Sequence, residues 1–257
     1  MIDLGFTEVF LAYLLVALAI GLSLYWKIPV QKDMALGSVR AFVQLIAVGY
    51  ALKYIFELQS PWLIHLAMLI MTLVGAQAAS SKVKNVGRSF WIAFISIAAG
   101  STVTLGLLLL LQIITFEARY TIPLAGMIIG NSMNASALTA NRICSDVRGH
   151  APVIEAALAL GKSWRTASLA YQKEAATAGM ISMLNFFKTV GIVALPGAMT
   201  GMILAGAEPL KAVLLQIVVG CMLLAAVTVT SIVTLELTVR QFFTPHHQLV
   251  ADREGCS

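Results

Sequence analysis

Long apolar runs without regular alternation dominate the chain. Each is about 20 residues long, which is the length that a helix needs to cross the ~30 Å hydrocarbon core of a bilayer. A membrane β-barrel would instead show segments of about 10 residues in which apolar and polar positions alternate. The pattern predicts a bundle of about seven transmembrane helices, at Phe6–Trp26, Leu36–Phe56, Trp62–Ala79, Phe90–Ile114, Ile122–Ala140, Val190–Ala205 and Ala212–Leu237.

The composition also indicates a membrane protein. Of the 257 residues, 59% are hydrophobic and only 11% are charged, whereas a soluble domain carries about 25% charged residues. So few charges cannot cover a water-facing surface, and we expect residues 1–257 to form one all-α transmembrane domain. The three cysteines are unclustered and make neither a disulfide framework nor a metal motif.

The basic residues predict the direction of the helices. Thirteen of the 17 lysines and arginines lie in the connections on one side, three lie on the other side, and Arg40 lies inside a span. Because the more basic side faces the cytoplasm, we expect the N-terminus outside and the C-terminus inside, which requires an odd number of crossings. Orientation therefore accounts for the net charge of +5, and no nucleic-acid partner is expected.

One cytoplasmic connection, at about residues 141–179, is much longer than the others. Pro152 suits a first helical turn, and the strong helix formers of Val153–Leu160 follow it. Gly161 suits the end of that helix, and Ser163 can cap a second helix from Trp164 to about Ala178. We therefore expect a short helix, a tight turn and a longer helix.

The short helix contains a pattern of interest, Glu155-Ala156-Ala157, three residues, then Gly161. It resembles the loop by which the permeases of ABC transporters dock onto their ATPase subunits. A short helix with small side chains that ends at a glycine is compact and can enter a cleft on a partner. The alternative is an ordinary alanine-rich surface helix, and the Ile-x-Leu-Pro that often follows in such permeases is missing, since Tyr171 and Gln172 stand near that point.

The fifth span contains an unusual number of polar residues. Asn131, Ser132 and Asn134 fall within four positions, and unsatisfied polar groups are costly in lipid. We expect them to face the bundle interior or a transport path; interhelical hydrogen bonding is the alternative. Gly126 and Gly130 have the spacing that lets helices approach closely.

A second glycine pair and several methionines accompany these residues. Gly197 and Gly201 repeat the Gly-x-x-x-Gly spacing, and Pro196 can kink or divide the sixth span. Met127, Met133 and Pro196 are expected to belong to the transport path or its gate. Thioether sulfurs can bind soft metal ions, although packing is the commoner role of methionine. No metal ligands can be assigned from this pattern.

Two stretches resemble a known family. Gly126-Met-Ile-Ile-Gly-Asn-Ser-Met-Asn134, which runs on to Asn141-Arg142, and Ala194–Gly206 are similar to the signatures of the FetB family of ABC-type iron export permeases. The plant aluminium-resistance half-transporters are similar too. The resemblance covers nearly the whole chain. It implies an export permease of the bacterial inner membrane that forms a dimer and works with a separate cytoplasmic ATPase.

These observations predict the membrane subunit of an ABC-type exporter of iron or another metal. This chain is expected to bind no cofactor and to have no ATPase activity, since Gly161-Lys162-Ser163 lacks the first glycine of a phosphate-binding loop. ATP would bind the partner subunit. The alternative is an autonomous secondary transporter or channel, which would favour ion-coupling carboxylates inside the spans; a membrane scaffold is a third possibility.

Overall fold

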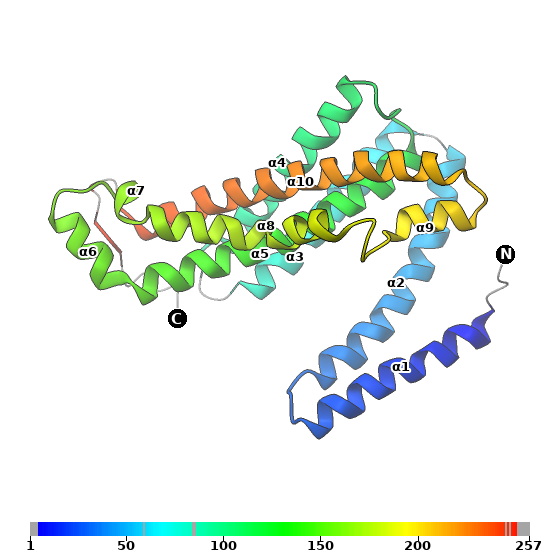
Figure 1. Cartoon of the computed structure of the whole chain (residues 1–257), viewed down its shortest axis with the longest axis horizontal. Helices are drawn as coiled ribbons and strands as arrows, with labels where there is room; N and C mark the ends of the chain where they lie inside the picture. The colour runs from blue at the N-terminus through cyan, green and yellow to red at the C-terminus, as the bar shows by residue number, and fades with distance from the viewer. Residues whose placement is uncertain (1–4, 59, 84–85, 245, 247, 251–257) are drawn as a thin grey trace. The chain divides into compact units, whose positions relative to one another are not determined.

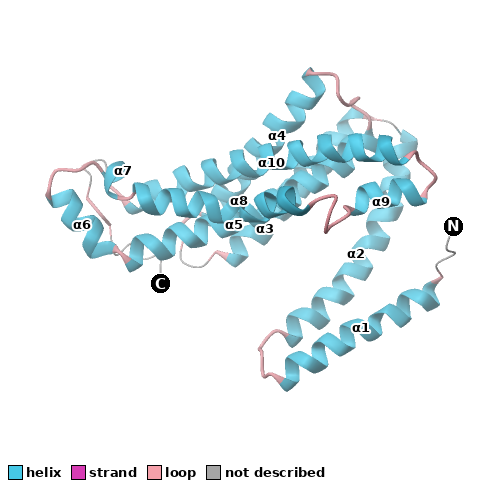
Figure 2. Ribbon diagram, in the orientation of Figure 1, coloured by secondary structure: helices cyan, strands magenta, loops and turns pink. Residues whose placement is uncertain are grey.

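A computed structural model describes residues 5–58, 60–83, 86–244, 246 and 248–250 (Figure 1). Over this part of the chain the structure is helical, and Figure 2 shows no strand among the described residues. The predicted all-α class is confirmed. The helices are α1 (Phe6–Tyr25), α2 (Gln31–Leu58), α3 (Pro61–Lys82), α4 (Ser89–Leu110), α5 (Ala118–Gly149), α6 (Ala151–Ala159), α7 (Trp164–Ala167), α8 (Leu169–Thr189), α9 (Gly197–Leu204), α10 (Pro209–Val239) and the 3-10 turn η1 (Arg240–Phe242).

The chain divides into two compact units, Met1–Ser60 and Pro61–Ser257. The first contains the helix pair α1 and α2. Tyr13 of α1 donates a hydrogen bond to the backbone carbonyl of Ser38 at 3.0 Å, and its ring meets Phe42 edge-on. Within this unit by itself most apolar side chains are exposed, which is expected of a helix pair whose solvent is lipid.

Five helices are long and apolar enough to cross a membrane, judged by length and composition over the described residues. They are α1, α2, α3, α4 and α10. Helix α5 is also long enough, with 32 residues, but it carries the polar residues noted above. The predicted fifth span, Ile122–Ala140, lies inside it. The protein therefore has several membrane-crossing helices, and the count of seven stays a prediction.

The predicted sixth span, Val190–Ala205, is wrong as a continuous helix. Helix α8 ends at Thr189, whose carbonyl accepts hydrogen bonds from the backbone N–H groups of Ile192, Val193 and Ala194. Gly191 has a φ of +84°, a left-handed conformation that glycine adopts without strain. Helix α9 starts only at Gly197, after Pro196. Its 8 residues reach about 12 Å, too short to cross a bilayer.

The connection between α5 and α8 has the predicted caps but different lengths. Pro152 lies in the first turn of α6, and Gly161 takes a φ of +83° after its end. The Ser163 hydroxyl accepts the backbone N–H of Thr166 and so caps α7. The predicted second helix is instead two helices, because α7 stops after one turn and α8 then runs on to Thr189.

Helix α5 is the centre of the second unit and packs against α3, α4, α8 and α10. Its contact with α10 includes two buried hydroxyl pairs that lie one turn apart. Thr230 donates to Ser132 at 3.1 Å, and Thr234 donates to Ser136 at 3.0 Å. All four side chains are at least 98% buried. Small residues with hydroxyl groups allow close helix packing and also satisfy each other's polar atoms.

We predict that these hydroxyl pairs contribute in a coupled way. Ser136→Ala removes the acceptor of the Thr234 hydroxyl, and we expect a loss of about 0.6–1.5 kcal/mol in the free energy of unfolding. The double variant Ser136→Ala with Thr234→Val should lose less than the sum of the single variants, because no hydroxyl then stays buried without its partner. Denaturation in mixed micelles measures this, and additive losses would contradict the coupling.

Candidate functional site

The predicted docking motif lies at one end of the second unit. Helices α5, α8 and α10 run side by side, and α6 and α7 close the end where α5 stops and α8 begins (Figure 1). Helix α5 continues to Gly149, nine residues beyond the predicted end of its span. Its 32 residues span about 48 Å, more than the ~30 Å of a hydrocarbon core. A helix of this length is longer than a hydrocarbon core is thick, and α6 follows at its end.

A separate apolar core attaches α6 to these helix ends. Ile154 of α6 is fully buried in a cluster with residues from the ends of α5, α8 and α10. Trp164 of α7 stacks on Phe243 at 5.4 Å between ring centroids. Since apolar burial on this scale resists rearrangement, α6 is a firm extension of the bundle.

The motif residues themselves form the outer side of α6. Glu155 and Ala156 are exposed, and Ala157 is half-buried. Gly161 is exposed in the turn that follows. This exposed surface contains small alanine side chains, and the helix that presents it is packed on the bundle. It is therefore available to a protein partner.

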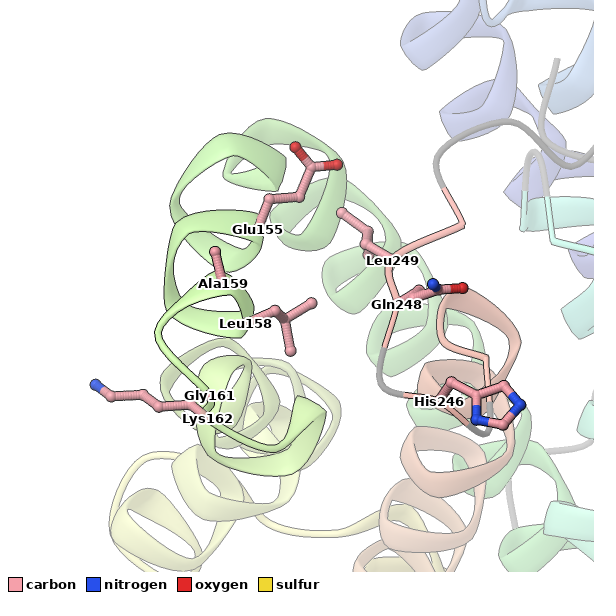
Figure 3. Close-up of a pocket in the computed structure, with 8 residues that line it drawn as sticks. All are labelled: Glu155, Leu158, Ala159, Gly161, Lys162, His246, Gln248 and Leu249. Carbon is pink, nitrogen blue, oxygen red and sulfur yellow. The ribbon is translucent and has the colours of Figure 1, made fainter.

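A cavity of about 480 Å³ lies beside α6, and the carboxyl-terminal segment forms its other wall. Figure 3 shows Leu158 of α6 and Leu249 of that segment facing each other, with Glu155 toward one end of the cavity. The segment folds back by a hydrogen bond from the backbone N–H of Val250 to the carbonyl of Phe242 at 2.8 Å. Sequence reasoning missed this wall, because no local signal links residues so far apart along the chain. The lining residues are Glu155, Leu158, Ala159, Gly161, Lys162, His246, Gln248 and Leu249.

Ion pairs join the helices near the same end. Arg142 of α5 contacts Asp146 in the same helix and Glu174 of α8, both at 2.8 Å. The hydrogen bonds that Arg142 donates, first to Asp146 and then to Glu174, raise the pKa of Arg142, so the guanidinium stays charged at any working pH. The carboxylate of Glu236 in α10 forms ion pairs with Arg165 of α7 at 2.8 Å and with Arg240 at 2.6 Å.

We predict that Arg142→Gln loosens the contact between α5 and α8. The carboxylate of Asp146, which is 8% exposed, would lose its charged partner, and the link to Glu174 would be broken. We expect a lower melting temperature of the detergent-purified protein than for the control Lys173→Gln, which removes an exposed charge on the same helix pair. Equal melting temperatures of the two variants would contradict this.

The structure separates the three polar residues of the predicted path. Ser132 is fully buried against α10, whereas Asn131 is half-buried and Asn134 is exposed. The Asn131 amide donates to the carbonyl of Met127 in its own helix at 2.8 Å. Met127 and Met133 are half-buried and pack on the apolar core. The hydroxyl thus bonds within the bundle, and only the two amides lie on the open side of α5.

Asn185 of α8 joins these amides, although sequence reasoning did not select it. Arg142 and Glu174 meet where α5 and α8 run antiparallel. Asn131 lies eleven residues before Arg142, and Asn185 lies eleven residues after Glu174. Eleven residues make about three helical turns. Both asparagines therefore lie on the same side of their helices as the ion pair, and at about the same height along the two helices. Asn185 is exposed.

The glycines of the two predicted packing motifs differ in their surroundings. A Cβ on Gly126 would lie 3.1 Å from the Met71 methyl carbon. A Cβ on Gly130, Gly197 or Gly201 would meet no heavy atom within 4 Å among the described residues, its own local backbone aside. Pro196 precedes the first residue of α9. Close packing at the last three glycines would therefore need a neighbour from outside this unit.

A protein-based metal site is not apparent where the structure describes the chain. No three histidine, cysteine, aspartate or glutamate side chains come together there. The metal ligands therefore stay unassigned.

Comparisons with known proteins place the chain in a family. A family model described as "Uncharacterised protein family (UPF0014)" matches residues 6–243. The protein ALUMINUM SENSITIVE 3 of Arabidopsis thaliana is 40% identical over 238 residues, which cover 93% of this chain and 87% of the relative. The UPF0014 membrane protein YjkA of Bacillus subtilis is 41% identical over 239 residues, 93% of this chain and 96% of the relative.

A third relative carries a functional name. The probable iron export permease protein FetB of Escherichia coli is 38% identical over 240 residues, which cover 93% of each chain. No solved structure matches this chain. The match over nearly its whole length, together with these relatives, confirms the resemblance seen in the two signature stretches: the chain belongs to the UPF0014 family of multi-pass membrane proteins, which includes FetB.

Proposed function

We propose that this protein is the membrane subunit of an ABC-type exporter of iron or another metal in the bacterial inner membrane. A separate cytoplasmic ATPase subunit would bind ATP and dock on α6. The proposal includes seven crossings, with the N-terminus outside and the C-terminus in the cytoplasm. The name of FetB as a probable iron export permease supports the transport class and the cargo.

One observation carries the proposal, namely the attachment of α6 to the ends of the long helices. Its inner side, through Ile154, belongs to the apolar cluster at the ends of α5, α8 and α10. Its outer side presents Glu155 and Ala156. A partner that moves on binding ATP can thus displace the ends of three long helices, because packed side chains transmit displacement instead of absorbing it.

The open side of α5 and α8 supports a homodimer with a path between or beside the copies. Asn131, Asn134 and Asn185 lie there, beyond the buried core of this unit. An amide that faces lipid at membrane depth loses its hydrogen bonds with water at a cost of several kcal/mol, about 4–8 for transfer into hydrocarbon. A second copy or a water-filled path would remove this cost. The clear space around Gly130 also suits close approach of a second helix.

Reconstitution of the purified chain in vesicles tests the proposal. Loaded iron should leave the cytoplasmic side only when the ATPase subunit and ATP are both present. Flux that follows an ion gradient with this chain alone would establish a secondary transporter instead. No flux under either condition, with the ATPase bound, would favour a scaffold and would contradict the proposal.

A further inference from the structure

A second cavity lies at the break between α8 and α9, at the other end of the second unit from α6. Its volume is about 380 Å³, within the range of sites for small ligands. Phe186 and Phe187 of α8, Met199 of α9 and Gly220 of α10 contribute to an almost wholly apolar wall. The turn at Gly191 forms its edge. Neither the docking motif nor the amide side of α5 takes part in it.

One polar side chain lines this cavity. Gln216 of α10 is 9% exposed, and its Oε1 atom is buried with no hydrogen-bond partner among the described residues. A buried carbonyl without a donor is unfavourable. Since the two ends of an amide can exchange by rotation, the group that best satisfies it is a hydroxyl, which both donates and accepts.

The position of Gln216 along α10 indicates where its ligand comes from. Glu208 and Lys211 form an exposed ion pair at the start of the helix, with 3.4 Å between N and O, as expected at a membrane surface. Gln216 lies five residues further, about 8 Å along the axis. Its neighbours Leu214 and Ile217 are 56% and 57% exposed. The cavity thus opens among lipid-facing side chains at the depth where the polar heads of lipids meet their chains.

We propose that this cavity is a binding site for a membrane lipid with a hydroxyl-bearing headgroup. One acyl chain lies against Phe186, Phe187 and Gly220, and a headgroup hydroxyl bonds the Gln216 amide. The bound chain fills the space between α9 and α10 and so holds the short α9 in place. This site is independent of the proposed transport function.

Photolabelling of the full-length protein in lipid nanodiscs tests the site. The probes are phosphatidylglycerol and phosphatidylcholine that carry the same diazirine-bearing acyl chain, and only the first has headgroup hydroxyls. We expect phosphatidylglycerol to label peptides of α8, α9 and α10 at this cavity about threefold to tenfold more strongly, which corresponds to one net hydrogen bond. Unlabelled phosphatidylglycerol should compete with the label.

Variants distinguish this site from general lipid contact. Gly220→Leu fills the cavity from α10 and Met199→Trp fills it from α9, and each should abolish its labelling. The control Ala225→Leu places the same leucine side chain at an exposed position of α10 and should change nothing. Gln216→Leu should remove the preference for phosphatidylglycerol, whereas a preference based on headgroup charge would survive it. The proposal would be overturned if Gln216→Leu kept the preference for phosphatidylglycerol, or if both filling variants were still labelled. It would also be overturned if a second copy covered the cavity of the wild type and kept it unlabelled.

Discussion

Replacement of Gly179 by alanine is expected to destabilise the protein by about 1–3 kcal/mol, the cost of overpacking a well-packed core. Gly179 of α8 is buried where α5, α8 and α10 meet. An added Cβ would lie 2.6 Å from the Ser231 hydroxyl and 3.1 Å from the Ala135 carbonyl, and it would also collide with the Thr139 hydroxyl. Side chains can rotate away, but the carbonyl belongs to the backbone of α5, so the helices must separate.

Gly106→Ala is the matched control for this prediction. Gly106 is exposed within α4, and a Cβ there would meet no heavy atom within 4 Å among the described residues. Alanine is the better helix former by about 0.8–1.0 kcal/mol, so the control should be neutral or slightly stabilising. Thermal unfolding of both variants in the same detergent gives the comparison. A melting temperature of Gly179→Ala equal to that of the wild type would show that the three helices are less closely packed than described.

Ala156→Arg is expected to lower binding of the ATPase subunit at least tenfold, with almost no change in the stability of the chain. Ala156 is exposed on α6, so arginine there meets no core residue, and such surface substitutions usually change stability by less than about 0.5 kcal/mol. If α6 enters a cleft on the partner, the long cationic side chain must be accommodated there. A tenfold loss needs only about 1.4 kcal/mol. Co-purification with the ATPase and ATP-dependent export measure the effect.

A second variant acts on the turn after α6. Gly161 has a φ of +83°, which costs other residues about 1–2 kcal/mol, so Gly161→Val should distort the turn and weaken the same coupling. Ala170→Arg, at an exposed position near the start of α8, is the control for added charge. Loss of binding in the control alone, or normal export by both α6-region variants, would argue against docking at this helix.

Local features were predicted from the sequence because short-range physics decides them. The length of an apolar run decides whether a helix can cross lipid, and five helices among the described residues are long and apolar enough. The cap at Ser163 and the left-handed glycine at Gly161 follow from the chemistry of single residues. The position of Pro152 in the first turn of α6 is of the same kind.

The break after Thr189 shows where such reasoning fails. Val190–Ala205 is apolar enough to predict a span, yet a turn at Gly191 and the helix start at Gly197 divide it. Hydropathy does not report backbone direction, and proline or glycine in a membrane segment is compatible with a kink, a turn or a straight helix. The surrounding helices decide among these, because they supply or withhold partners for the freed backbone groups.

The sequence alone determined the all-helical membrane class, the Glu-Ala-Ala pattern of the short helix and the polar character of the predicted fifth span. The tertiary structure decided which of those polar residues bond inside the bundle: Ser132 meets Thr230, while Asn131 and Asn134 turn away. It also brought Asn185 to the same side and Leu249 against α6. The reason is that one residue advances a helix by about 100°, so neighbours in sequence face different partners, and only the packing of distant helices selects which partner each one meets.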